Sequence, residues 1–125
     1  MGKQFSFKKE ERLAGEKHIK ELFEKGSSFH LYPFRVLTLP NSEPEPKLNQ
    51  VLISVSKRNF KRAVDRNLIK RRVREAYRLQ KDQINGLSLL LAFVYTSKEI
   101  EPFQLIKDKL FLVLEKIKKL GVSKS

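Results

Sequence analysis

The first apolar pattern along the chain is helical. Ile19, Leu22 and Phe23 are spaced three and four positions apart, so they share one face of a helix. A glycine after the last periodic residue is a common helix end. The pattern therefore predicts a helix over Glu16–Lys25 that stops at Gly26.

Four later segments have the pattern of strands. Pro33 separates the first two and restricts the first to an edge of the sheet. A third segment alternates apolar and other residues, and a fourth, LSLLLAFVY, is almost continuously apolar, as expected of a strand buried on both faces. The expected strands are Ser27–Leu31, Phe34–Leu39, the segment around Val51–Val55, and Leu87–Tyr95. The proline-rich stretch 40–49 predicts a loop.

Two further helices complete the pattern. One should begin between Phe60 and Asp65 and run to about Gln83, with Asn85-Gly86 following it. The other has apolar residues at Phe103, Ile106, Leu110, Val113, Leu114 and Ile117, with Pro102 at its first turn. We expect it to end at Gly121, and we expect residues 1–12 and 121–125 to be flexible.

The order of elements, α-β-β-β-α-β-α, predicts one α+β domain over residues 1–125, built as a two-layer sandwich of a sheet and its helices. We find no internal repeat and no second domain. The strand–helix–strand unit from Val51 to Tyr95 can form a parallel pair, and such crossovers are in general right-handed.

Charge adds a function to this fold. The chain carries 27 Lys and Arg against 14 Asp and Glu, for a net charge of +13, which favours polyanionic partners. It has no cysteine, so thiolate metal sites and cysteine nucleophiles are excluded. No apolar run approaches the ~18 residues of a membrane span, and we expect no membrane partner.

The charge is concentrated on one side of the long helix. Asn67, Lys70, Arg71, Arg74, Arg78 and Lys81 share one helical face, whereas Ile69, Val73, Ala76, Tyr77 and Ile84 share another. Between Lys57 and Arg74 there are nine basic residues and one acid, Asp65. A merely solvated face is usually balanced by acids, so we favour a polyanion. Lipid would need the apolar face that the sheet occupies.

Nucleic acid is therefore the expected partner, and RNA fits better than DNA. Major-groove readers usually present a short recognition helix within a helical unit. Structured RNA is recognised largely through shape, phosphates and 2′-hydroxyl groups. The chain shows no catalytic motif: His18 and His30 have no metal-ligand spacing, and the acids are scattered. We expect no catalytic residue and no metal ligand in the protein.

These residues also resemble a specific signature. SVSK at Ser54–Lys57, followed by Ala63-Val64-x-Arg66-Asn67-x-x-Lys70-Arg71-x-x-Arg74-Glu75, is similar to the RNR signature of the bacterial ribonuclease P protein family. FSFKKEERL at Phe5–Leu13 resembles the N-terminal segment of that family. The length and the element order fit as well, so the resemblance covers nearly the whole chain.

The resemblance implies a ribosomal-protein-S5-domain-2-like fold with a left-handed crossover, against the general expectation. It implies a protein subunit of a ribonucleoprotein endonuclease that removes the 5′ leader of precursor tRNA. The partners would be the catalytic RNA and precursor tRNA, in the cytoplasm. Mg²⁺ would serve the RNA, with no cofactor on the protein. The implied contacts to the catalytic RNA are Lys57, Arg58, Lys61, Arg62, Arg66, Asn67, Lys70, Arg71, Arg74 and Arg78.

The family also holds the single-stranded leader in a cleft between the first helix and the sheet. The candidates here are Ile19, Phe23 and Phe34. Ile19 and Leu37 stand where relatives can have aromatic residues, which implies weaker stacking on leader bases. Core packing is the alternative for Phe23 and Phe34. Two other functions stay open: a ribosomal or other structural RNA-binding protein of similar fold, and an autonomous nuclease.

Overall fold

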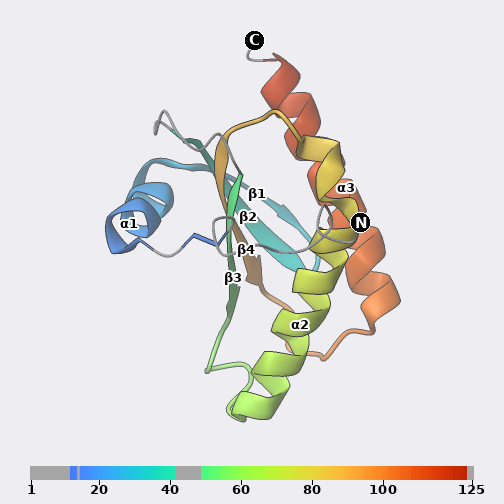
Figure 1. The fold of residues 1–125 in the computed structure, drawn as a ribbon. Coiled ribbons are helices and arrows are strands. Elements are labelled where there is room, and N and C mark those ends of the chain that lie inside the picture. The colour runs from blue at the N-terminus through green and yellow to red at the C-terminus, as the bar shows by residue number, and fades with distance from the viewer. Residues whose placement is uncertain (1–11, 14, 42–48, 124–125) are drawn as a thin grey trace.

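A four-stranded sheet lies between helices on both of its faces (Figure 1). In this computed structural model, residues 12–13, 15–41 and 49–123 are described. The elements are α1 (Glu16–Lys25), β1 (Ser27–Leu31), β2 (Phe34–Pro40), β3 (Gln50–Val55), α2 (Ala63–Gln80), the 3₁₀ helix η3 (Lys81–Ile84), β4 (Leu89–Tyr95) and α3 (Phe103–Ser123). The predicted α+β class and element order are confirmed. In addition to the predicted layers of sheet and helices, α1 covers the face of the sheet opposite α2 and α3.

The sheet has the order β1-β2-β4-β3. β4 is therefore an inner strand, although it is the last strand in the sequence. β4 pairs antiparallel with β2 and parallel with β3. The predicted parallel pair across the strand–helix–strand unit is therefore confirmed. β2 and β3 follow one another in the chain but both use β4 as their neighbour.

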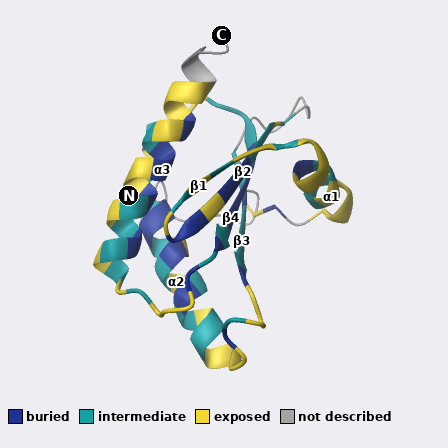
Figure 2. Ribbon diagram, turned by 180° about the vertical axis from the view of Figure 1, so that it is seen from behind, coloured by how far each residue is buried: buried dark blue, intermediate teal, exposed yellow. Residues whose placement is uncertain are grey.

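The larger core fills the space between the sheet and helices α2 and α3 (Figure 2). Successive residues of a strand point to opposite faces, so Leu91, Phe93 and Tyr95 of β4 all point toward these two helices. The Tyr77 ring of α2 lies 5.8 Å from the Phe93 ring, at a tilt of 56°. Burying each large apolar side chain stabilises the fold by about 1.5–3 kcal/mol, and this layer supplies most of that burial.

A smaller core lies under α1. Leu13, Leu22, Leu37, Leu90 and Ala92 are buried there together. The Leu13 backbone N–H donates to the Val51 carbonyl at 2.9 Å. The backbone of Arg12 forms an isolated parallel β-bridge with Val51. The chain before α1 thus pairs with the otherwise open edge of β3, which protects that edge from pairing with another molecule.

Two predicted boundaries differ from the structure. α3 continues through Gly121 to Ser123, so the predicted stop at Gly121 is wrong; a glycine inside a helix costs only about 1 kcal/mol. The long helix changes to 3₁₀ geometry after Gln80 and ends at Ile84. Gly86 then adopts φ 89°, a conformation that favours glycine. The flexibility predicted for the termini falls mostly outside the described residues, which leave out 1–11 and 124–125.

Asn49 generates a test of the fold. Its side-chain amide donates to the Ile84 carbonyl at 2.8 Å, and its oxygen accepts from the Leu89 N–H at 3.0 Å. Asn49→Ala leaves both backbone groups without this partner, so we expect a loss of about 1–3 kcal/mol in unfolding free energy. Chemical denaturation measures it, and exposed Asn67→Ala should change stability by less than about 0.5 kcal/mol. Equal stability of both variants would contradict the bridging role.

Candidate nucleic-acid interface

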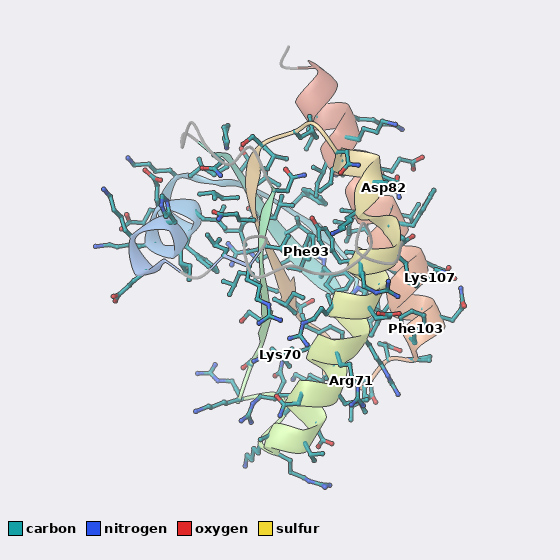
Figure 3. All side chains as sticks on the ribbon, in the orientation of Figure 1. Lys70, Arg71, Asp82, Phe93, Phe103 and Lys107 are labelled. Carbon is teal, nitrogen blue, oxygen red and sulfur yellow. The ribbon has the colours of Figure 1, made fainter. Side chains whose placement is uncertain are left out.

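Helix α2 has one side in the core and another in solvent. Ile69, Val73, Ala76 and Tyr77 are at most 1% exposed, which confirms the apolar face expected from the sequence. Asn67, Arg71 and Arg74, which lie on the predicted basic face, are exposed. Burial of the first set fixes the rotation of the helix and so determines where the second set points. Figure 3 shows Lys70 and Arg71 on α2, below the buried Phe93 of β4.

The predicted RNA-contacting residues form one continuous stretch of the fold. Lys57 and Arg58 lie in the turn after β3, Lys61 and Arg62 immediately precede α2, and the rest project from the helix. Seven of the cationic side chains make no hydrogen bond or ion pair with the described part of the chain: Lys57, Arg58, Lys61, Arg62, Lys70, Arg71 and Arg74. We call this set the basic surface.

Arg66 behaves differently from the rest of the signature. Its Nη1 donates to the Phe60 carbonyl at 2.8 Å and to the Lys61 carbonyl at 2.9 Å. Phe60 is buried and its ring lies 6.0 Å from that of Tyr95. Arg66 therefore clamps the segment before α2 against the helix, and its position fixes where Lys61 and Arg62 stand.

Arg78 is also engaged within the protein. Its Nε and Nη2 donate to the two carboxylate oxygens of Glu75 at 2.8 and 2.7 Å. This hydrogen bonding lowers the pKa of Glu75 below its ordinary value and raises the pKa of Arg78. The pair relieves some of the repulsion among the cations along α2.

Sequence reasoning gave Arg72 no role. The structure places its Nη1 2.7 Å from the Glu101 carbonyl, in the segment between β4 and α3. The same segment is held by Tyr95, whose hydroxyl donates to the Glu99 carbonyl at 2.6 Å and accepts from the Glu101 N–H at 3.0 Å. Arg72 thus positions the start of α3 beside α2. Its neighbours in sequence carry the same charge, so no local signal distinguished it.

The leader-cleft candidates separate into two groups. Ile19 is half-buried against the smaller core, and Phe23 is 43% exposed one turn later on α1. Phe34 is fully buried in the larger core, on the face of the sheet opposite α1. The centre of its ring lies 6.1 Å from that of Tyr95, which is on the same face. No base can reach Phe34, so its assignment to the leader cleft is wrong. Strand alternation gives the reason, because Leu37 and not Phe34 points toward α1.

The sheet face on the α1 side carries residues that sequence reasoning missed. Leu52 and Val94 pack beside the smaller core and remain half-exposed, and Ser54 is half-exposed on the same face of β3. Arg35 of β2 is exposed and pairs in register with Val94. The usable signal was the alternation of each strand counted from its buried residues, which assigns these four positions to the face of α1.

Neither a metal-binding cluster nor a membrane-spanning helix is found in the described ranges. Residues 12–13, 15–41 and 49–123 contain no group of three or more His, Asp or Glu placed to hold a metal ion. Over the same ranges, no helix has the length and apolar character needed to cross a membrane.

Comparison with known proteins gives a consistent result. The Ribonuclease P family profile matches residues 7–118. The chain is 38% identical over 109 residues to the ribonuclease P protein component of Porphyromonas gingivalis, covering 82% of this chain and 80% of the relative. Its structure is similar to that of the Staphylococcus aureus RNase P protein, with a TM-score of 0.73 and 28% identity, over 89% of this chain and 97% of that one. The Thermotoga maritima RNase P protein gives a TM-score of 0.72 at 25% identity, over 85% and 96% of the two chains.

The clamp formed by Arg66 can be tested by stability. Arg66→Ala removes two charge-assisted hydrogen bonds, of which the one to the Phe60 carbonyl is partly buried, so we expect a loss of about 1–3 kcal/mol in unfolding free energy. Arg62→Ala, at an exposed position with no side-chain partner among the described residues, should cost less than about 0.5 kcal/mol. Thermal and urea unfolding measure both. If Arg66→Ala is as stable as Arg62→Ala, the clamp does not hold the segment.

Proposed function

Because the chain belongs to the bacterial ribonuclease P protein family, we propose that its basic surface binds the catalytic RNA of ribonuclease P and that the α1 side of its sheet guides the leader of precursor tRNA. The family membership itself establishes the subunit role. The protein is a non-catalytic component of a tRNA-processing ribonucleoprotein endonuclease. A structural RNA-binding protein without a processing role is not favoured, since the matches cover nearly the whole chain.

The observation that carries the RNA assignment is that the basic surface finds no partner in the part of the chain that the structure describes. Its seven cations repel one another and find no acid among the described residues. Phosphates relieve that repulsion, and binding releases the counterions condensed on the RNA. Asn67, exposed among these cations, adds a neutral donor and acceptor for a 2′-hydroxyl or a base edge. Arg66 supports this surface by holding the backbone at Phe60 and Lys61. Arg78 pairs with Glu75 next to it on α2.

The leader assignment rests on Ile19 and Phe23 of α1, together with Arg35, Leu52 and Val94 of the neighbouring sheet face. Phe23 is exposed enough for a base to stack on it. Arg35 offers a cation for the leader backbone, and Leu52 and Val94 offer apolar contact. Aliphatic residues at positions 19 and 37 leave Phe23 with more of the stacking, so base contacts should be weaker than in relatives with several aromatic residues there.

Magnesium belongs to the RNA in this proposal. The cleavage chemistry lies in the catalytic RNA with Mg²⁺, in the cytoplasm where precursor tRNA is made. The protein contributes positive charge that lowers the repulsion between RNA and substrate. Less Mg²⁺ is then needed to bring the two together.

Reconstitution tests the division of labour. Protein freed of RNA should not cleave precursor tRNA, and adding it to a bacterial ribonuclease P RNA should lower the Mg²⁺ concentration required for cleavage at the mature 5′ end. The reason is that the seven cations of the basic surface replace part of the screening by Mg²⁺. A cleavage assay over a Mg²⁺ series measures this effect. Site-specific cleavage by the protein alone would overturn the proposal.

Single substitutions separate binding from folding. Arg74→Ala should weaken binding to the catalytic RNA and reduce the slope of log K against log salt by about 0.7–0.9, the value for one lost phosphate contact. Its unfolding free energy should change by less than about 0.5 kcal/mol. Binding titrations at several salt concentrations provide the slope.

The neighbouring residue serves as the opposite control. Val73 is fully buried, so Val73→Ala should lower the melting temperature and leave the salt slope unchanged. If Arg74→Ala unfolds the domain while binding per folded molecule is unaffected, the basic surface is structural and the RNA assignment fails.

Phe23 provides a test specific to the leader. Phe23→Leu keeps the apolar volume but removes the aromatic face, so affinity for precursor tRNA in the holoenzyme should fall by about 1 kcal/mol, the low end of the range for one stacked base. Mature tRNA, which lacks the leader, should bind with unchanged affinity. Equal losses for both RNAs would show that Phe23 serves packing and leave the leader on another path.

A further inference from the structure

A groove of about 560 Å³ opens between α2 and the start of α3, next to the basic surface. Leu68 of α2 and Phe103, the first residue of α3, supply its apolar lining, and both are half-exposed. The other lining residues are Arg71, Arg72, Arg74, Glu75 and Arg78. Figure 3 shows Phe103 and Arg71 on adjacent helices. Pockets that bind small ligands commonly enclose about 300–1,000 Å³, so the groove can hold a group as large as a nucleotide.

The arginines around the groove fall into two kinds. Arg72 and Arg78 are held by acceptors within the protein, the Glu101 carbonyl and the Glu75 carboxylate. Arg71 and Arg74 are exposed and have no side-chain partner within the described ranges. Two cations are therefore fixed in place as walls, and two are available for an incoming anion. The negative charge of Glu75 is balanced by Arg78, which donates to both of its carboxylate oxygens, so Glu75 does not repel an anion at the opening.

This combination matches one chemical class. An apolar surface with an aromatic ring accepts a planar base, and adjacent free guanidinium groups accept its phosphate. An acidic peptide would satisfy the arginines but would not use the Phe103 ring. The groove also shares Arg71 and Arg74 with the basic surface, so the RNA that covers that surface passes its mouth.

Resting on the proposed function, we propose that this groove takes one unpaired nucleotide of the catalytic RNA, with its base against Phe103 and Leu68 and its phosphate at Arg71 and Arg74. A base within a duplex has both faces covered by stacked neighbours, so the nucleotide must be a bulged or looped one. Such a contact adds recognition of one RNA position to a surface that otherwise binds phosphates, which carry no sequence information.

Chemical probing of the complex tests the inference. The wild-type protein is bound to a bacterial ribonuclease P RNA without precursor tRNA, and reagents that modify the exposed edges of unpaired bases are applied. We expect at least one unpaired base to be protected by the wild-type protein and to become reactive with Phe103→Leu. Phe111→Leu is the matched control, because Phe111 is on the same helix, 45% exposed and outside the groove; it should keep the protection.

A second variant blocks the groove without touching α3. Leu68→Trp adds bulk to the lining and should expose the same base, whereas Leu79→Trp, at an exposed position of α2 outside the groove, should not. Replacing the identified nucleotide by an abasic one should weaken wild-type binding roughly fivefold or more, the lower bound for one stacked base. The abasic RNA should bind Phe103→Leu no more weakly than intact RNA does.

The outcomes distinguish this inference from the function on which it rests. If the wild-type protein fails to bind the RNA, the proposed function falls and the inference falls with it. If binding is normal but neither Phe103→Leu nor Leu68→Trp changes any base reactivity, only the inference is overturned. Protection that appears only after precursor tRNA is added would likewise overturn it, since the nucleotide would then belong to the substrate.

Discussion

Burial of one side of α2 against the sheet is the constraint on which the rest of the molecule depends. Ile69, Val73, Ala76 and Tyr77 have almost no exposed surface. A rotation of the helix by a single residue would carry a charged side chain toward the core, where an unpaired charge costs several kcal/mol. The packing therefore specifies one orientation of the helix. The cations on its other side are held in a fixed array although they repel one another.

Most of the fold could be predicted from the sequence because it depends on local periodicity. The apolar stripes of α2 and α3 have a helical period, and the continuous apolar run of β4 matches its place inside the sheet. The basic surface was predictable for the same reason, since the apolar stripe determines which side of α2 remains in solvent. The resemblance to a family signature then supplied the RNA partner, which charge alone left less defined.

The remaining features depend on contacts between distant segments or on which face of a strand is covered. Phe34 and Leu37 are both apolar residues of one strand, and only the position of α1 determines which of them lies beneath it. Arg66 and Arg72 look like further cations of α2, yet backbone carbonyls at Phe60 and Glu101 engage them. The sequence shows the charge of an arginine but not the acceptor that it meets, so a cationic motif mixes side chains that bind with side chains that hold the fold.

The inner position of β4 has a consequence for how the protein is made. The strand that joins β2 and β3 is synthesised long after both of them. Phe34 of β2 pairs with Tyr95, and Val51 of β3 pairs with Leu91. Pairings between such distant residues form slowly, since a long loop must close first. Until residues 89–95 are available, β2 and β3 lack their shared neighbour, and a hairpin of β1 and β2 alone is marginally stable in water. Pairing of β4 is thus the step that joins these separate parts into a single sheet.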